Sequence, residues 1–167
     1  LWKVYGAAQA INVGDFLLMI APLPIIESQL DDSIKVQLLN IFTRMSAQVV
    51  SGQVREFELA KMSDVVRLKQ EYRECIAQKT STLFSHLALG VATIANAKQV
   101  EKISIEEIFF KLGDIFQIQD DILDLFGNKK RDDVGCDIKE GKVSFLVVTH
   151  LDHYPEDFKL LKEVLQK

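Results

Sequence analysis

Three aspartates in one short stretch carry the clearest chemical signal in this sequence. The stretch FQIQDDILDLFG, residues 116–127, contains Asp120, Asp121 and Asp124, with Gln117 one helical turn earlier. Because an α-helix turns about 100° per residue, Asp120 and Asp124 lie on one face and Asp121 lies beside them. Like charges at this spacing repel each other, so we expect a cation to offset that cost. Carboxylate oxygens suit Mg²⁺, which usually takes one or two of them and completes its octahedron with water and phosphate.

The alternative is an acidic helix face that water solvates, which is the commoner fate of a run of charges. Apolar residues nevertheless surround the aspartates and leave little of this helix free to be an ordinary wet surface: Ile115, Phe116, Ile118, Ile122, Leu123, Leu125 and Phe126. The spacing alone therefore leaves both interpretations open.

Three further features carry side chains that suit the same chemistry. The first is a polar row at steps of three and four residues on one predicted helix: Gln48, Gly52, Gln53 and Glu56. The second is Lys79-Thr80, at the start of an apolar helix, where the lysine lies either at a solvated end or in a cavity that holds an anion. The third is a loop, residues 129–137, followed by Gly141-Lys142, whose cations and glycines suit a lid over phosphate oxygens. Taken singly, each feature is at least as well explained as exposed surface, and for the polar row and Lys79 exposure is the favoured interpretation.

Composition indicates one globular domain of ordinary type. The chain has 167 residues, of which 48% are hydrophobic and 26% charged, and its 8 Gly and 3 Pro favour long helices. A net charge of -4, without any aromatic and basic strip, argues against nucleic acid as a partner. The two cysteines, Cys75 and Cys136, have no metal-type spacing and fit a reducing compartment, so we expect a cytoplasmic protein. An organellar targeting signal could have been lost, because the chain starts without Met and reads as a piece of a longer one.

The apolar periodicity predicts helices throughout and no strand, which gives an all-α bundle of one domain with long helices side by side. Small residues near the N-terminus, such as Gly6 and Gly14, suit close helix packing. The apolar runs 11–26 and 83–97 fall short of the ~18 to 20 residues of a membrane span, so we expect no integral membrane segment. The predicted helices are about 2–20, ended by Pro22 and Pro24; about 32–61; one capped by Ser63; about 79–96; one opened by a capping box of Ser104 and Glu107; 142–151; and one from Pro155.

Together the motifs resemble those of the trans-isoprenyl diphosphate synthases, the farnesyl and geranylgeranyl diphosphate synthases and their relatives. The matching pieces are GQ with an acid three residues after the glutamine, Y-x6-KT from Tyr72 to Thr80, FQIQDDILD, and G-x-DI-x2-GK from Gly135 to Lys142. The segment GAAQAINVGD also looks like the one that follows the family's first aspartate-rich motif. The resemblance covers nearly the whole chain and implies an isoprenoid synthase-type bundle, with residues 1–167 as the central and C-terminal-side portion of a polyprenyl synthetase domain.

The resemblance implies a Mg²⁺-dependent prenyltransferase. In that family an allylic prenyl diphosphate ionises to an allylic cation, isopentenyl diphosphate attacks, and a proton is lost. By position, Asp120, Asp121 and Asp124 would be the second aspartate-rich motif that binds metal, with Asp120 and Asp124 as direct ligands. The resemblance further implies that Lys79 and Lys142 bind the allylic diphosphate, that Thr80, Gln117 and Gln53 line the site and steady the cation or its leaving group, and that Asp137 supports a metal-bound water or orients Lys142. The family is commonly homodimeric.

Two departures from the family pattern bear on activity. The first aspartate-rich motif is absent from this chain, so we expect it to be inactive alone. The family usually has a lysine just ahead of the glycine that matches Gly135, and here Asp132 and Asp133 occupy that place. The reversed charge should weaken diphosphate binding by about 1 to 3 kcal/mol, unless a cation of residues 129–131 compensates.

Two other classes of function compete with the enzyme. One is a non-catalytic regulatory subunit of a heteromeric prenyl diphosphate synthase, for which the missing lysine would signal a relaxed catalytic demand. The other is a helical structural module whose acidic helix binds cations or a partner. A second D-D-x2–4-D motif upstream of Leu1 would favour the enzyme, a degenerate motif the regulatory subunit, and no motif the structural module.

Overall fold

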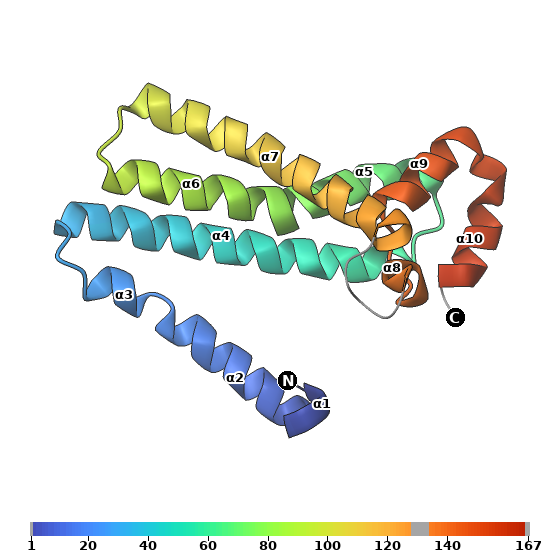
Figure 1. Cartoon of the computed structure of the whole chain (residues 1–167), viewed down its shortest axis with the longest axis horizontal. Helices are drawn as coiled ribbons and strands as arrows, with labels where there is room; N and C mark the ends of the chain where they lie inside the picture. The colour runs from blue at the N-terminus through green and yellow to red at the C-terminus, as the bar shows by residue number, and fades with distance from the viewer. Residues whose placement is uncertain (1, 128–133, 166–167) are drawn as a thin grey trace.

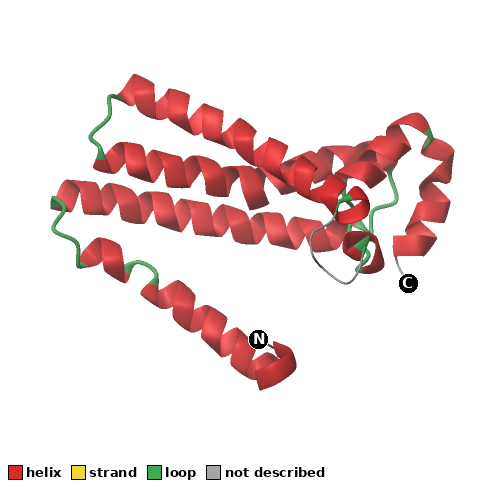
Figure 2. Ribbon diagram, viewed as in Figure 1, coloured by secondary structure: helices red, strands yellow, loops and turns green. Residues whose placement is uncertain are grey.

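Helices form all the regular structure in the described part of the chain, residues 2–127 and 134–165. The computed structural model has no strand among these residues, which confirms the all-α prediction (Figures 1 and 2). The helices are α1 Trp2–Tyr5, α2 Ala7–Ile20, α3 Leu23–Ile26, α4 Asp32–Leu59, α5 Val65–Ile76, the π-helical turn η1 Ala77–Ser81, α6 Thr82–Ile94, α7 Gln99–Phe126, α8 Cys136–Lys139, α9 Phe145–His153, the 3-10 turn η2 Pro155–Asp157 and α10 Phe158–Leu165.

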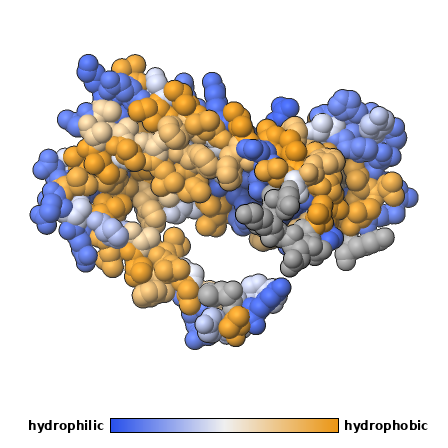
Figure 3. Space-filling model, viewed as in Figure 1, coloured by the Kyte–Doolittle hydropathy of each residue, from blue (hydrophilic) through white to orange (hydrophobic). Residues whose placement is uncertain are grey.

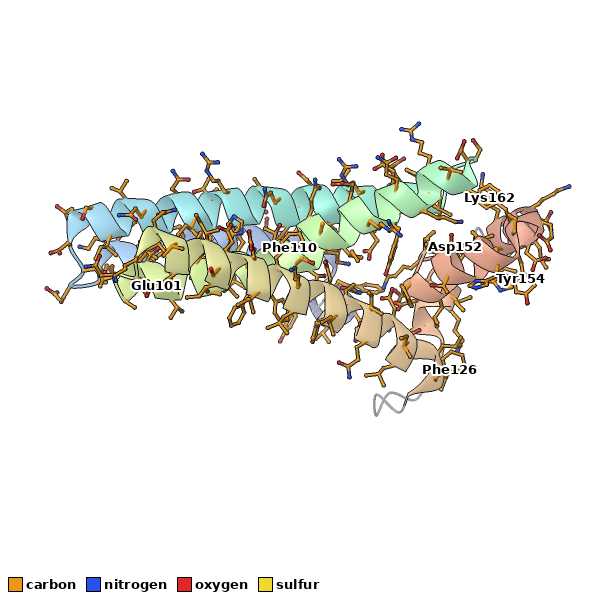
Figure 4. All side chains as sticks on the ribbon, turned by 90° about the horizontal axis from the view of Figure 1, so that it is seen from above. Glu101, Phe110, Phe126, Asp152, Tyr154 and Lys162 are labelled. Carbon is orange, nitrogen blue, oxygen red and sulfur yellow. The ribbon has the colours of Figure 1, made fainter. Side chains whose placement is uncertain are left out.

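Three long helices, α4, α6 and α7, lie side by side, with α6 packed against both of the others (Figure 1). The most extensive contact between helices joins α6 to α7. Within it, the ring centroids of Phe84 and Phe116 lie 5.2 Å apart. Figure 4 shows α7 along its length, from Glu101 near its start to Phe126 at its end. The aspartates lie in the last two turns of α7, at the end of the bundle where α5, α8 and α9 gather.

Several helices begin at other residues than the sequence suggested. The predicted capping box of Ser104 and Glu107 is wrong, because α7 already starts at Gln99, where the Glu101 carboxylate accepts a hydrogen bond from Lys98 N at 2.7 Å. Asp64 caps α5 in place of Ser63, since its carboxylate accepts from Arg67 N at 2.8 Å. Residues 142–144 precede α9. Lys142 N donates to Asp137 O of α8 at 2.8 Å, and Phe145 N, at the start of α9, donates to the Asp121 carboxylate of α7.

The fully buried core lies at the same end of the bundle as the aspartates. It joins α4 and α5 to α9 and α10, beneath the polar side chains described below. Figure 4 labels Asp152, Tyr154 and Lys162 in this C-terminal group of helices, where Asp152 forms an ion pair with Lys69 of α5. The core residues are Leu59, Leu68, Tyr72, Cys75, Val143, Val147, Val148, Leu151 and Leu165.

The N-terminal helices contribute no buried residue. Gly6, at φ 82°, separates α1 from α2. Helix α2 lies apart from the bundle, and the chain reaches α4 through α3 (Figure 1). The predicted close packing of small residues is absent at Gly14, where a Cβ would meet nothing within 4 Å. The segment Ala7–Ile26, mean hydropathy 1.5, is long and apolar enough to cross a membrane by length and composition alone, although Pro22 interrupts its helix.

Candidate active site

Polar side chains from four helices and one turn meet in a pocket at the end of α7. The pocket has a volume of about 220 Å³ and lies beside the buried core. Its lining residues are Glu56 of α4; Tyr72, Cys75 and Ile76 of α5; Lys79 of η1; Gln117, Asp120 and Asp121 of α7; Asp137 of α8; and Lys142, Val143 and Ser144. The structure therefore brings together six of the predicted site residues: Lys79, Gln117, Asp120, Asp121, Asp137 and Lys142.

Asp121 is the most heavily bonded carboxylate of the pocket and is only 5% exposed. Its Oδ2 accepts hydrogen bonds from Tyr72 Oη at 2.8 Å and from Phe145 N at 2.6 Å. Its Oδ1 accepts from Gln117 Nε2 at 2.9 Å, one helical turn back on α7. Burial raises the pKa of Asp121, and these three hydrogen bonds act against that rise. Asp121 thus joins α7 to α5 and to the start of α9.

The hydroxyl of Tyr72 is a permanent hydrogen-bond donor to Asp121. Burial, and then the charge of Asp121, raise the pKa of its phenol well above the ordinary value, so the hydroxyl keeps its proton. The sequence presented Tyr72 only as part of an apolar stripe and of the Y-x6-KT motif. Its position seven residues before Lys79, two turns along the helix, was the only signal that it shares a face with the site.

Lys79 is held by an acid that the sequence placed in the polar row of α4. Its Nζ lies 2.7 Å from both carboxylate oxygens of Glu56, which accepts in turn from Gln53 Nε2 at 2.6 Å. Gln53 was expected to line the site, but it does not reach the pocket and acts on Glu56 instead. Gln48 is exposed on the same helix.

Thr80 lies behind the pocket rather than on its wall. Its Oγ1 donates to Gln117 Oε1 at 2.6 Å, so Gln117 links Thr80 to Asp121 through the two ends of its amide. This chain of bonds fixes which end of the Gln117 amide faces Thr80, because the carboxylate of Asp121 accepts only from the NH₂ group.

Lys142 and Asp137 form the wall opposite Lys79. Lys142 Nζ lies 3.3 Å from Asp137 Oδ1 and 2.6 Å from Glu140 Oε2. Burial lowers the pKa of Lys142, but hydrogen bonds to Glu140 and Asp137 outweigh it, and the net effect raises the pKa. The predicted contact between Asp137 and Lys142 is therefore present.

Asp124 is buried outside the pocket lining and anchors the segment that follows α7. Its Oδ2 accepts from Asp137 N at 3.0 Å, and its backbone carbonyl accepts from Gly135 N at 2.9 Å. The charged residues of the predicted lid, Lys129, Lys130, Arg131, Asp132 and Asp133, lie outside the described residues.

The charge of the pocket indicates what it can bind. Among its described lining residues, Glu56, Asp120, Asp121 and Asp137 bear carboxylates, and only Lys79 and Lys142 bear ammonium groups. An anion such as a diphosphate would meet both lysines, but it needs a cation to lie against the acids. The described residues include no group of three ligands placed to hold a metal ion by themselves. Half-buried Asp120 on the pocket wall offers carboxylate oxygens, which suit a Mg²⁺ ion whose coordination substrate phosphate and water would complete.

Comparisons with known proteins identify relatives of one kind. A sequence model of the family described as "Polyprenyl synthetase" matches residues 1–167. A short chain isoprenyl diphosphate synthase of Methanocaldococcus jannaschii is 33% identical over 160 residues, which cover 93% of this chain and 47% of that protein. Human farnesyl pyrophosphate synthase is 33% identical over 135 residues, which cover 77% of this chain and 32% of that enzyme.

Solved structures extend the likeness to the fold. A crystal structure of a geranylgeranyl pyrophosphate synthase superposes with a TM-score of 0.85 at 29% identity, over 99% of this chain and 50% of that one. A polyprenyl synthetase from Streptomyces coelicolor A3(2) superposes with a TM-score of 0.80 at 27% identity, over 98% and 48%. The chain spans about half the length of these structures, and a third to a half of the two curated relatives. The match over its full length and the acidic pocket at the end of α7 lead to one conclusion: the chain belongs to the polyprenyl synthetase family.

Proposed function

We propose that the protein is a trans-prenyltransferase, which condenses an allylic prenyl diphosphate with isopentenyl diphosphate. The observation that carries the proposal is the pocket in which Lys79, Lys142 and Asp120 converge from three separate elements. The similarity to proteins named as short chain isoprenyl diphosphate and farnesyl pyrophosphate synthases supports the same substrate class. The chain would supply one wall of the site in the full-length protein.

The two lysines hold and neutralise the diphosphate of the allylic substrate. When the C–O bond breaks, the bonding electron pair leaves with the diphosphate, and Lys79 and Lys142 stabilise the charge that develops on its oxygens. The Gln117 amide, fixed between Thr80 and Asp121, presents its dipole beside the carbon centre that becomes positive. The double bond of isopentenyl diphosphate then forms the new C–C bond, and loss of a proton restores a double bond.

We further propose that Mg²⁺ binds with the substrate, and that Asp120 is its direct ligand in this chain. When bound, Mg²⁺ neutralises diphosphate oxygens and so favours departure of the diphosphate. Asp121 and Asp124 use their oxygens on Tyr72, Gln117, Phe145 and Asp137, so they position α7 and α8 around the ligand. This assignment narrows the sequence prediction, in which Asp124 was a direct ligand.

An apolar groove between α6 and α7 suits the hydrocarbon chain of a prenyl diphosphate. The groove has a volume of about 580 Å³ and begins at Leu83, one turn after Lys79 and Thr80. Leu87 and Val91 continue it along α6 and are 57% and 67% exposed in this chain. Apolar walls would also keep water away from an allylic cation, which water would otherwise trap as an alcohol.

The test is turnover of the full-length protein with isopentenyl and allylic diphosphates and Mg²⁺. Asp120→Ala should lower turnover by about 10² or more, because the leaving diphosphate loses neutralisation. Glu107→Ala, which removes an exposed carboxylate from the same helix, is the control and should leave turnover unchanged. Full turnover in Asp120→Ala would contradict the metal assignment. Diphosphate binding without any turnover in the wild type would instead favour the non-catalytic subunit.

A further inference from the structure

The helical path from α5 to α6 contains one irregular turn, and that turn carries Lys79 and Thr80. Residues Ala77–Ser81 form the π-helical turn η1, between Ile76 at the end of α5 and Thr82 at the start of α6. A π-turn inserts an extra residue into an α-helix and changes the direction of the side chains around it. Because an α-helical path is the more stable alternative, contacts from neighbouring elements are needed to hold the turn.

Two glycines on the neighbouring helices grip the backbone of η1 from opposite sides. At Gly52 of α4, a Cβ would come to 2.5 Å from Lys79 N and 2.8 Å from Lys79 Cα. At Gly113 of α7, a Cβ would come to 3.1 Å from Ser81 N and would overlap Ser81 Cα. Backbone atoms cannot move aside as a flexible side chain can, so any larger residue at either position must displace the turn.

Four consecutive side chains of η1 are also bonded to these two helices. Gln78 accepts from Arg55 Nε at 3.1 Å, and Thr80 donates to Gln117 at 2.6 Å. The first two side chains are held by α4 and the next two by α7. The pairs are Gln78–Arg55, Lys79–Glu56, Thr80–Gln117 and Ser81–Asp114.

We propose that Gly52, Gly113 and Asp114 are positioning residues that hold η1 and thereby aim Lys79 at the substrate and Thr80 at Gln117. None of the three lines the polar pocket, so each acts through the turn. Gly52 acts on Lys79, whose backbone it touches. Gly113 and Asp114 act on Ser81, and through it on the hydrogen bond from Thr80 to Gln117. The inference rests on the proposed function, because a bound diphosphate is the target of Lys79.

The first test measures the affinity of the full-length protein for inorganic pyrophosphate with Mg²⁺, by calorimetry. Gly52→Ala and Lys79→Ala should each weaken binding about tenfold, because each takes a charge-assisted hydrogen bond from the anion. The double variant should bind no more weakly than Lys79→Ala alone, since Gly52 acts through Lys79. Gly90→Ala on α6 is the matched control, because its Cβ would lie an ordinary 3.7 Å from Leu38 Cδ2.

A second pair of variants adds no volume and so avoids the risk that a glycine variant fails to fold. Asp114→Ala removes the acceptor of the Ser81 hydroxyl, and we expect kcat to fall about tenfold with pyrophosphate affinity unchanged. Asp114→Asn keeps a carbonyl oxygen for Ser81 and should restore kcat. A merely structural role would leave kcat per folded molecule at the wild-type value in both variants.

The outcomes separate this inference from the proposed function. If the wild type does not bind pyrophosphate, the proposed function and the inference both fail. If the wild type binds but folded Gly52→Ala binds equally well, or its effect adds in full to that of Lys79→Ala, only the inference is overturned. Equal loss of kcat in Asp114→Asn and Asp114→Ala would overturn the part that concerns α7.

Discussion

At the scale of single residues, two adjacent aspartates divide the work of the site. Asp121 is buried and spends its oxygens on donors from α5, α7 and the start of α9. Asp120 is half-buried on the pocket wall. One residue of separation turns the side chain by about 100°, so Asp121 reaches donors of α5 and α9 while Asp120 lies half-buried on the pocket wall.

This division predicts that two alanine substitutions lower the free energy of unfolding by unequal amounts. Asp121→Ala leaves the Tyr72 hydroxyl, the Phe145 amide and the Gln117 amide without their acceptor, and should lower the free energy of unfolding by about 3 kcal/mol. Asp120→Ala removes a carboxylate that is only half-buried and should lower the free energy of unfolding by less than Asp121→Ala does. Urea unfolding of both variants measures the difference. Equal destabilisation by the two substitutions would contradict the division.

The second prediction at this scale concerns Cys75, a buried thiol whose Sγ donates to Gly52 O at 3.3 Å. Burial, and then the charge of Glu56, raise the pKa of Cys75 to about 11. At pH 8 only about one thiol in a thousand is then ionised, and the thiolate is the reactive form. Alkylation followed by peptide mass spectrometry should label half-buried Cys136 first and Cys75 faster as pH rises toward 11.

Labelling in urea supplies the control, because both thiols should react at similar rates once the chain is unfolded. Rapid labelling of Cys75 at pH 8 in the folded protein would contradict its burial.

The sequence was informative about which residues meet, and less so about what each one does. Helical spacing put Asp120 and Asp124 on one face, with Asp121 beside them and Gln117 one turn earlier, because that geometry is local. The structure has Asp120, Asp121 and Gln117 on the pocket wall and Asp124 outside it. The partners of Asp121 come from residue 72 and from the backbone of residue 145, and no local pattern encodes such contacts. For the same reason Gln53 was expected on the pocket wall, although it bonds to Glu56 instead.

At the scale of elements, residues 134–144, which contain α8 and lead into α9, are a tightly bonded connection that carries one wall of the site. Gly135, at φ 71°, precedes α8, and Gly141, at φ 72°, precedes Lys142. Backbone bonds fix this path, including Lys142 N to Asp137 O at 2.8 Å. Each glycine allows a left-handed backbone conformation that other residues adopt only at a cost.

Gly141 provides the prediction at this scale. Gly141→Ala should lower the free energy of unfolding by about 2 kcal/mol or more, because the left-handed conformation costs ~1–2 kcal/mol and the new Cβ would also overlap the carbonyl oxygen of Leu165. Gly14→Ala is the contrasting variant. It lies inside α2 with nothing within 4 Å and should be neutral or slightly stabilising. Thermal unfolding monitored by circular dichroism distinguishes the two, and equal melting temperatures would contradict the prediction.

The apolar periodicity of the sequence predicted most of the helices, but it did not predict the residues at which they begin or the π-turn. Asp64 caps α5 one residue after the predicted Ser63, and the cap of α7 at Lys98 lies six residues before the predicted Ser104. The π-turn has no residue signature of its own. It becomes necessary only once α4 and α7 fix where Lys79 and Thr80 have to point, and that is a property of three packed helices.

At the scale of the whole molecule, apolar surface is distributed unevenly. Buried core gathers at the end with α5, α9 and α10, while α6, α7 and α2 expose large apolar side chains. Figure 3 shows these side chains across the face over α4, α6 and α7 and on the N-terminal helices. We assign the groove beside α6 to the substrate chain. The N-terminal helices contribute no residue to the pocket or the groove, so their apolar surface must be covered by something other than the substrate chain.

We propose that a second copy of the protein covers α2, consistent with the homodimer expected from the family resemblance. Phe16 and Met19 are 62% and 78% exposed, and burying such a side chain contributes about 1.5–3 kcal/mol. The full-length protein should therefore be a dimer by light scattering after size-exclusion chromatography. Phe16→Glu places a charge in that apolar contact and should weaken the dimer by roughly 30-fold or more.

Gln37→Glu, which adds the same charge at an exposed position on α4, is the control and should remain dimeric. The dimer would matter for catalysis only indirectly, because none of the described pocket residues lies on α2. Phe16→Glu should therefore keep its affinity for pyrophosphate, while its mass by light scattering falls to that of a monomer. A monomeric wild type, or a Phe16→Glu variant that stays dimeric, would show that α2 is covered by something other than a second copy.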